Sequence, residues 1–199
     1  MPQAKPLIRS LLAMGDEGYS FLVVPGGGPM ADLVREIYSR GDLSDEAAHW
    51  MAVLAMEQYA HFLADGTGAS LTSDIRRPCP EVEPALLVLL PYQALRRDDR
   101  GLEHNWDYTS DSVATLIAAQ LKAPLIKATD VDGVIIDCVV ASKLSASRLL
   151  GRESCIDQGT ISLLSGPLRK MKVWVLNGTD ERRFTDALKK GEGGTVIIG

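Results

Sequence analysis

Three consecutive glycines, Gly26 to Gly28, stand between the apolar run Phe21 to Val24 and a segment with helical periodicity. Glycine allows backbone amides to approach a ligand closely, and the amino end of a helix favours an anion. A tight strand-to-helix turn also needs glycine for its backbone angles, but a single glycine would satisfy that need. The triplet therefore predicts a loop that faces an anionic ligand such as a phosphate.

Two familiar phosphate-binding motifs do not explain this loop. Gly26 to Ala31 matches the letters of the G-x-G-x-x-G/A dinucleotide fingerprint. That fold requires a second strand ending in an acidic residue about 20 positions later, and this chain has a long helical pattern there. No Lys-Ser or Lys-Thr follows the glycines, so the P-loop is excluded as well. The general anion-binding property of glycine amides remains.

Two polar clusters follow in the second half of the chain. The first opens a helical pattern and comprises Thr109, Ser110, Asp111 and Ser112. The second begins within a strand pattern and comprises Lys127, Thr129, Asp130, Asp132 and Gly133. Ser110 or Asp111 could be an ordinary helix N-cap, and Asp132 with Gly133 an ordinary turn. Two acids beside a lysine are nevertheless typical of a nucleotide or metal locus.

The elements that must position these residues alternate along the chain. Helical periodicity is present at 7–12, 30–37, 110–122 and 180–190, and Ser44 is a candidate N-cap for a long helix over 45–64 that is apolar on most sides. Short aliphatic segments at 21–24, 85–92, 123–130, 133–140, 171–178 and 193–199 have the character of buried strands, and 67–84 resembles a loop. This alternation predicts an α/β fold with a mostly parallel sheet covered on both faces.

Composition narrows the class of protein. A chain of 199 residues, 46% hydrophobic, is expected to form a single domain over 1–199. Its net charge of -5 argues against nucleic acid or an anionic membrane as a partner. Three cysteines without a CxxC pair predict reduced thiols in the cytoplasm, and no apolar run reaches the ~20 residues of a membrane span. His49 and His61 lie on different helical faces, so no zinc site is expected, and no residue is assigned as a metal ligand.

The order of the segments VVPGGGP, SDS, APLIKATDVDGVI and GGTVI resembles the amino acid kinase superfamily of aspartate, glutamate, uridylate and isopentenyl phosphate kinases. Within it, LSDEAAHWMAVLAMEQY and HNWDYTSDS resemble the archaeal kinases of methanofuran biosynthesis, which convert an aminomethylfuran-methyl phosphate to its diphosphate. The resemblance implies a three-layer αβα sandwich and a homo-oligomer. It also implies ATP and Mg²⁺ as cofactors and a small phosphate-bearing acceptor.

The resemblance also implies roles for individual residues. The expected catalytic group is Gly26, Gly27, Gly28, Asp111 and Lys127. The expected acceptor-binding residues are His49, Trp106, Asp107, Thr109, Ser110 and Ser112, and the nucleotide-binding residues are Thr129, Asp130, Asp132, Gly133 and Lys170. Without the resemblance, Trp106 fits a core position, Asp107 a turn, and His49 a structural position in a helix.

The superfamily's opening strand, Lys-x-Gly-Gly-Ser, is expected to be missing, because this chain begins MPQAKPLIRS in a helical pattern. Loss of one positioned cation predicts a rate reduction on the order of 10² to 10³. Two explanations stay open: a start that omits upstream residues, or a natural short form that binds ligand without catalysis. The alternatives to a furan phosphate kinase are therefore a uridylate, isopentenyl phosphate or amino-acid kinase, and a non-catalytic nucleotide-binding protein.

Overall fold

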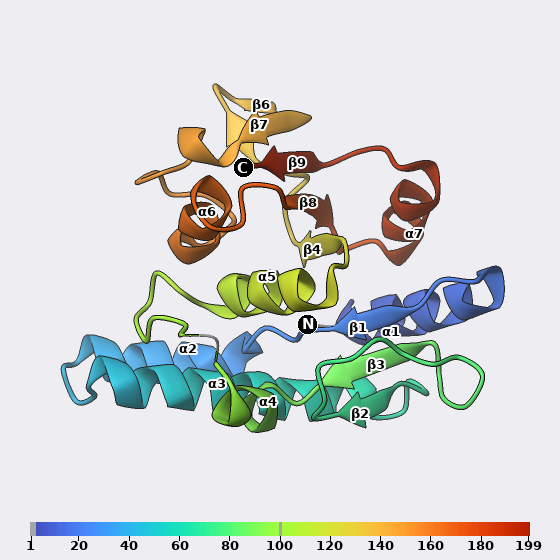
Figure 1. Cartoon of the computed structure of the whole chain (residues 1–199), viewed down its shortest axis with the longest axis horizontal. Coiled ribbons are helices and arrows are strands. Elements are labelled where there is room, and N and C mark those ends of the chain that lie inside the picture. Colours follow the sequence, from blue (N-terminus) through green and yellow to red (C-terminus); the bar gives the residue numbers. More distant parts are fainter. Residues whose placement is uncertain (1–2, 100) are drawn as a thin grey trace. The chain divides into compact units, whose positions relative to one another are not determined.

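The computed structural model describes residues 3–99 and 101–199, and the chain divides into two compact units, Met1–Trp106 and Asp107–Gly199 (Figure 1). Each unit contains parallel strands covered by helices. Of the strand pairings between described residues, four are parallel and two are antiparallel. The predicted α/β fold with mostly parallel sheets is confirmed. The single domain over 1–199 stays a prediction.

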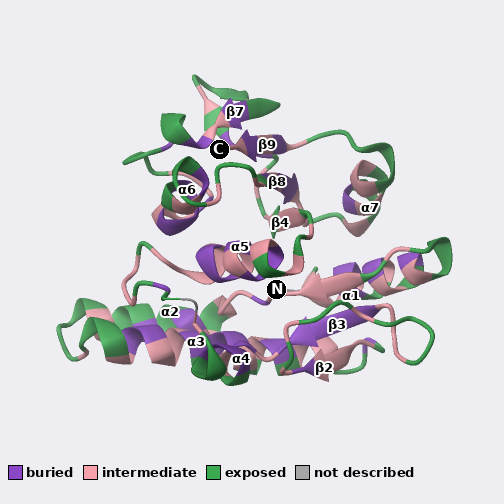
Figure 2. Ribbon diagram, in the orientation of Figure 1, coloured by how far each residue is buried: buried purple, intermediate pink, exposed green. Residues whose placement is uncertain are grey.

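The first unit is built on a three-stranded parallel sheet in the order β1-β3-β2. Its central strand β3 is completely buried, as four consecutive aliphatic residues require (Figure 2). The elements of this unit are α1 (Ala4–Ala13), a 3₁₀ turn η1 (Met14–Glu17), β1 (Phe21–Val23), α2 (Gly28–Ser39), α3 (Asp45–Ala64), β2 (Ser70–Thr72), β3 (Leu86–Leu89) and α4 (Pro91–Arg97).

Helix α3 organises the first unit. It begins as predicted at Ser44, whose hydroxyl accepts a hydrogen bond from the Ala47 amide at 3.3 Å. Most of its residues are buried or half-buried, and it packs against α1, α2, α4 and the sheet (Figure 1). Glu57 of α3 accepts a hydrogen bond from the Gln93 amide at 3.1 Å in the first turn of α4. The all-round apolar pattern thus reflects a helix with several packing partners.

The second unit contains a four-stranded mixed sheet in the order β4-β8-β9-β7. Strands β4 and β8 are parallel with Thr129 opposite Asn177, whereas β8 and β9 are antiparallel. Helices α6 and α7 lie on the two sides of these strands (Figure 1). The elements are α5 (Ser110–Leu121), β4 (Leu125–Thr129), β5 (Ile135–Ile136), β6 (Val139–Val140), β7 (Lys143–Ser145), a 3₁₀ turn η2 (Ala146–Arg148), α6 (Gln158–Ser165), β8 (Lys172–Asn177), α7 (Glu181–Lys190) and β9 (Thr195–Ile198).

The prediction of one buried strand over 133–140 is wrong. The segment forms a two-stranded hairpin, β5 with β6, in which Ile135 and Val139 are exposed (Figure 2). Asp137 and Cys138 both have positive φ, at 50° and 63°, as the two central residues of a type I′ turn require. The tight turn therefore divides the aliphatic run, which the hydrophobic pattern alone did not reveal.

Four elements were not predicted: β2, α4, β7 and α6. Strand β2 lies inside the expected loop 67–84, and it is ordered by pairing with β3 rather than by its own pattern. Among the residues described, no helix has both the length and the apolar character needed to cross a membrane.

The turn before β9 gives a test of the packing in the second unit. A Cβ on Gly194 would lie 2.0 Å from the Val175 carbonyl oxygen, and its φ is +62°. Gly194→Ala is expected to lower the free energy of unfolding by at least about 3 kcal/mol, because strain and a backbone clash add. Urea denaturation measures this loss.

Gly191→Ala is the matched control. Its φ is +69°, and a Cβ there meets no atom within 4 Å. It should cost only about 1 kcal/mol from backbone strain. If the two variants lose the same free energy of unfolding, the expected clash of a Cβ at position 194 with the Val175 carbonyl oxygen is wrong.

Candidate active site

The amino ends of α5 and α6 are joined by one carboxylate, that of Asp157. Its Oδ2 accepts hydrogen bonds from the amides of Thr109 at 2.8 Å and Ser112 at 3.0 Å, at the start of α5. Its Oδ1 accepts from the Thr160 amide at 2.7 Å, at the start of α6. The hydroxyls of Thr109 and Ser112 also donate to it, each at 2.8 Å. Asp157 therefore caps two helices and opposes both helix dipoles.

This arrangement corrects the N-cap alternative for α5. Neither Ser110 nor Asp111 is the cap, because the helix begins after Thr109 and its free amides bond to Asp157. Asp157 itself was missed by the sequence reasoning. An Asp three residues before Thr160 and ahead of an apolar helix is a recognisable N-cap for α6, but its bonds to residues 45 and 48 positions earlier leave no local signal.

Asp111 and Lys127 form a half-buried ion pair next to this junction. The Lys127 ammonium, from the middle of β4, donates to Asp111 Oδ2, and the Asp157 amide donates to the same oxygen at 3.2 Å. Burial raises the pKa of the Asp111 carboxyl, while the adjacent Lys127 acts in the opposite direction. The pair holds a positive charge beside a helix amino terminus, an arrangement suited to phosphate oxygens.

The residues of α5 and α6 next to the Asp111–Lys127 ion pair are closely packed. Ser112, Thr115 and Thr160 are completely buried. A Cβ on Gly159 would lie 2.4 Å from the Tyr108 ring, so only glycine fits this position. The Gly159 amide donates to the Asp107 carbonyl at 2.7 Å, which ties α6 to the segment before α5. Ser110 is half-buried in the first turn of α5.

The loop after β4 is fixed by the neighbouring strands. The Thr129 carbonyl accepts from the Gly178 amide at 2.7 Å, and Asp132 accepts from the Asn177 amide group at 2.8 Å. Gly133 has a φ of +144°, and a Cβ there would lie 2.5 Å from Thr195 Oγ1. The Thr129 hydroxyl donates to the exposed Asp130 at 3.3 Å. This loop is therefore held at the carboxyl ends of two parallel strands, where open α/β sheets bind ligands.

A cavity of about 370 Å³ adjoins this loop within the second unit. It lies in the size range of small-molecule pockets. Its walls are Val131, Gly133, Val134, Ile135, Ile136, Asp137, Leu149, Arg152, Glu153, Ser154 and Cys155. Burial raises the pKa of the Cys155 thiol, so this wall is uncharged at that position. Gly133 is the predicted nucleotide-binding residue that lines the cavity.

Lys170, also predicted to bind the nucleotide, lies away from this loop, and its role stays a prediction. It is exposed in the turn between α6 and β8, at the amino end of β8. Thr129 and the loop that follows lie at the opposite end of the strands, because Thr129 is paired with Asn177. The length of a six-residue strand, roughly 20 Å, separates the two ends. The sequence pattern around residue 170 did not show at which end of β8 Lys170 lies.

In the first unit, the glycine loop joins β1 to α2 as predicted. A Cβ on Gly27 would lie 2.3 Å from the Ala31 Cβ, and one on Gly28 would lie 3.1 Å from the Tyr59 ring. Gly28 also has a φ of +53°. Packing and backbone geometry thus require glycine at two of these positions. Gly26, like the other two, is half-buried, and the anion-facing role of the triplet stays a prediction.

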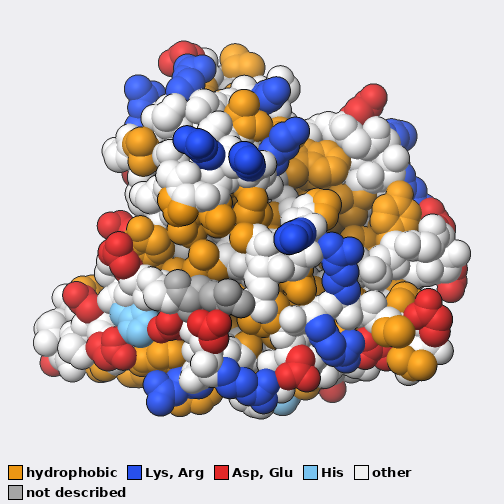
Figure 3. Space-filling view, viewed as in Figure 1, with side chains coloured by type: hydrophobic (Ala, Val, Ile, Leu, Met, Phe, Trp, Pro, Cys, Tyr) orange, Lys and Arg blue, Asp and Glu red, His pale blue; other side chains and the backbone are white. Residues whose placement is uncertain are grey.

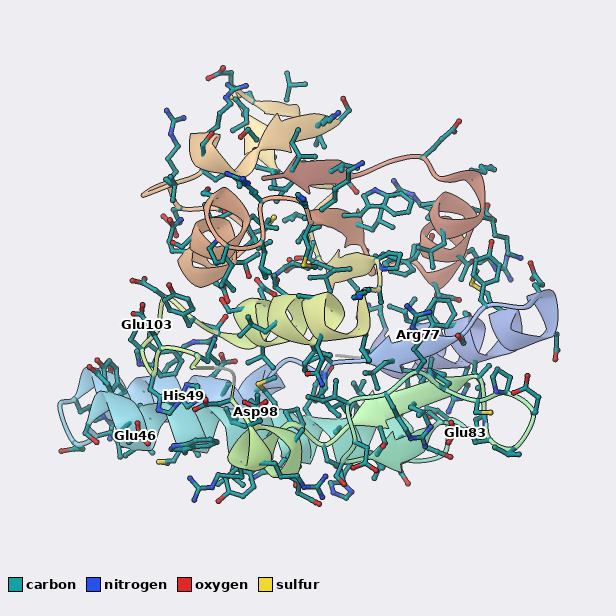
Figure 4. All side chains as sticks on the ribbon, in the orientation of Figure 1. Glu46, His49, Arg77, Glu83, Asp98 and Glu103 are labelled. Carbon is teal, nitrogen blue, oxygen red and sulfur yellow. The ribbon has the colours of Figure 1, made fainter. Side chains whose placement is uncertain are left out.

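His49 and Trp106 each carry a buried ring nitrogen that has no hydrogen-bond partner within the part of the chain that the structure describes. His49 lies on the amino-terminal half of α3, close to Glu46 (Figure 4). Burial, and to a lesser degree His104, lowers the pKa of His49 to about 4. Trp106 packs against Tyr38 with ring centroids 5.6 Å apart, under the Arg35 guanidinium at 5.4 Å. Two buried polar atoms without protein partners are typical of a ligand site.

Comparison with known proteins identifies the family. No family model matches the chain. The [5-(aminomethyl)furan-3-yl]methyl phosphate kinase of Methanocaldococcus jannaschii is 32% identical over 196 residues, which span 94% of this chain and 87% of that protein. Among solved structures, the uridylate kinase of Archaeoglobus fulgidus has a TM-score of 0.62 at 22% identity, covering 96% of this chain and 92% of that one.

Two further solved structures share the fold. The UMP kinase of Bacillus anthracis has a TM-score of 0.64 at 16% identity, over 98% of this chain and 86% of that one. The T. acidophilum isopentenyl phosphate kinase has a TM-score of 0.59 at 17% identity, over 98% and 89%. This chain belongs to the amino acid kinase family and is a phosphotransferase. The M. jannaschii furan phosphate kinase is the relative whose sequence it matches over nearly its whole length.

The double cap by Asp157 gives a test of the site's architecture. Asp157→Ala leaves the amides of Thr109, Ser112 and Thr160 without their acceptor. It is expected to lower the free energy of unfolding by about 3 kcal/mol, because two helices lose their cap and buried donors are left without a partner. Chemical denaturation followed by circular dichroism measures the change.

Asp180→Ala is the control, because Asp180 caps only α7, through the amides of Arg182 and Arg183 at 3.0 Å. Its cost should be about 1 kcal/mol. If both substitutions lower the free energy of unfolding by the same amount, the second helix cap made by Asp157 does not contribute to stability.

Proposed function

We propose that this protein transfers the γ-phosphoryl group of ATP to [5-(aminomethyl)furan-3-yl]methyl phosphate and forms its diphosphate, as a step of methanofuran biosynthesis. The match over 94% of the chain to a kinase of that name carries the proposal. The charge arrangement around Asp111, Lys127 and Asp157 supports it. We further expect a cytoplasmic homo-oligomer that takes a small-molecule substrate and no nucleic acid.

The chemistry needs charge and position more than proton transfer. An oxygen of the acceptor phosphate forms a bond to the γ-phosphorus, and the bond from that phosphorus to the β-bridging oxygen breaks, so that ADP leaves. The attacking oxygen is already anionic near neutral pH, and no general base is required. Fixed positive groups that meet the oxygens in the transition state supply most of the acceleration.

Lys127 is the residue to which we assign this charge. Its ammonium is held by Asp111, and Asp111 in turn accepts from the Asp157 amide. Because the ion pair already fixes the Lys127 side chain, no further free energy is needed to order it when the transition state forms. The amides of Ser110 and Asp111 and the glycine loop at 26–28 are assigned to phosphate oxygens, whereas the amides of Thr109 and Ser112 donate to Asp157.

The loop at 129–133 and the adjoining cavity are assigned to the nucleotide. Val131, Val134 and Ile135 give the cavity apolar walls, while Asp137 and Arg152 give it polar groups, a combination that suits a nucleobase. No cluster of three metal-ligating side chains exists among residues 3–99 and 101–199. Mg²⁺ is usually held by one or two carboxylates and the substrate's phosphates. Asp130 would be such a carboxylate, and the ion would neutralise phosphate charge.

The acceptor is assigned to His49, Trp106 and Asp107. The uncharged His49 ring would hydrogen-bond the acceptor phosphate, the indole of Trp106 would stack on the furan, and the Asp107 carboxylate would meet the ammonium. His49 and Trp106 support this assignment because their buried ring nitrogens have no partner among the described residues. Ser110, half-buried in the first turn of α5, is assigned to the acceptor as well. The hydroxyls of Thr109 and Ser112 donate to Asp157, so these two residues are assigned a supporting role behind the acceptor.

The test is formation of ADP and of the furan diphosphate, followed by ³¹P NMR, with ATP, Mg²⁺ and the furan phosphate. UMP, isopentenyl phosphate and glutamate are the comparison acceptors. The furan phosphate is expected to give the highest kcat/KM. Faster turnover of another acceptor would replace the proposed substrate, and ATP binding without transfer to any of them would favour a non-catalytic protein.

Lys127→Met gives the sharper prediction about the mechanism. The substitution keeps the length of the side chain and removes its charge, so kcat should fall by about 10² to 10³. The KM values should change little if the charge acts mainly in the transition state.

Lys172→Met is the matched control, since Lys172 is an exposed lysine at the start of β8. It should keep kcat within about twofold. A Lys127→Met enzyme with undiminished kcat would remove Lys127 from the mechanism.

A further inference from the structure

His104 is held between two carboxylates. Its Nδ1 contacts Glu46 Oε2, and its Nε2 lies 3.2 Å from Asp99 Oδ2. Each ring nitrogen of His104 therefore faces one carboxylate, which fixes the position and the orientation of the imidazole ring. Figure 3 shows a histidine surface next to acidic side chains.

His104 also stacks on His49. The ring centroids are 3.9 Å apart and the planes differ by 11°. The edge of Trp50 contacts both rings, with centroids 5.1 Å from His49 and 5.3 Å from His104. Glu46 fixes this indole by accepting from its Nε1 at 2.7 Å. One carboxylate of α3 thus restrains the two rings that enclose His49.

Two stacked imidazole rings at this distance cannot both be charged without strong repulsion. The charged groups that face His49 are Glu46 from its own helix, and Asp99 and His104 from the segment after α4. Burial lowers the pKa of His49 most, His104 lowers it further, and the two carboxylates act in the opposite direction. His49 is 7% exposed and is neutral at physiological pH.

We propose that His104 is a positioning residue of the acceptor site: held between Glu46 and Asp99 through its two ring nitrogens, it fixes the His49 ring by stacking on it. The Nε2 of His49, which has no partner among the described residues, then serves as an uncharged hydrogen-bonding group whose state does not change near neutral pH. The acceptor part of this inference rests on the proposed function, whereas the coupling of the two rings does not.

Histidine NMR tests the coupling directly, because the chain has three histidines and their imidazole signals can be resolved. His104→Phe keeps an aromatic ring in the stack and removes both ring nitrogens, so the effect of His104 that lowers the pKa of His49 is lost. The midpoint of His49 protonation is expected to rise by about one pH unit or more. His104→Gln, which removes the imidazole without replacing it by an aromatic ring, should shift the midpoint in the same direction.

His61→Phe is the matched control, since His61 is exposed in the last turn of α3. It should leave the midpoint of His49 unchanged. If His49 keeps its wild-type midpoint in both folded His104 variants, the coupling is wrong.

The ligand arm uses inorganic phosphate and the furan phosphate as probes. Both should perturb the His49 signals of the wild-type protein. In His104→Phe, the acceptor KM should become pH-dependent between about pH 5 and 7, while the wild-type KM stays level. Turnover with a His49 signal that neither probe perturbs would overturn the positioning role. No turnover with any acceptor would instead overturn the proposed function, and a shifted His49 midpoint would still support the ring coupling.

Discussion

The carboxylate of Asp157 is the point on which the second unit's site depends. It accepts hydrogen bonds from three backbone amides and two hydroxyls, at the starts of α5 and α6. A single charge placed against two helix amino termini satisfies donors that would otherwise be buried without partners. Its own amide then orients Asp111, which holds Lys127. The position of the one lysine assigned to phosphoryl transfer is thus set by a residue that needs no direct contact with substrate.

The two units treat buried titratable groups in opposite ways. Around Lys127 the protein retains charge, by placing an ammonium against a carboxylate in a half-buried setting. Around His49 it suppresses charge, by burying the ring and stacking a second histidine on it. The proposed function would account for both, because the transferring phosphate oxygens need a cation, whereas the acceptor must bind and then leave as product. A neutral hydrogen-bonding ring provides orientation without a tight ion pair.

The glycines illustrate how packing and function are combined. Gly133, Gly159 and Gly194 each sit where a Cβ would meet another atom at 2.5 Å or less. All three lie in the second unit, in or next to loops that border the cavity or the helix starts. The backbone at these glycines therefore lies directly against neighbouring atoms, and this contact fixes the loops. The amides and carbonyls of the loops consequently point in defined directions. Gly27 and Gly28 show the same constraint in the first unit, at the turn into α2.

The sequence by itself determined the local elements and the family. Periodicity and caps located α1, α2, α3, α5, α7 and the main strands, because those signals lie within one helix or strand. The motifs around Gly26, Asp111 and Asp130 indicated phosphate chemistry for the same reason. Only the tertiary structure decided the partners of Asp157 and His104, the position of Lys170 at the amino end of β8, and the hairpin in place of a buried strand. These depend on contacts between residues dozens of positions apart, or on a turn whose geometry hydrophobicity does not encode.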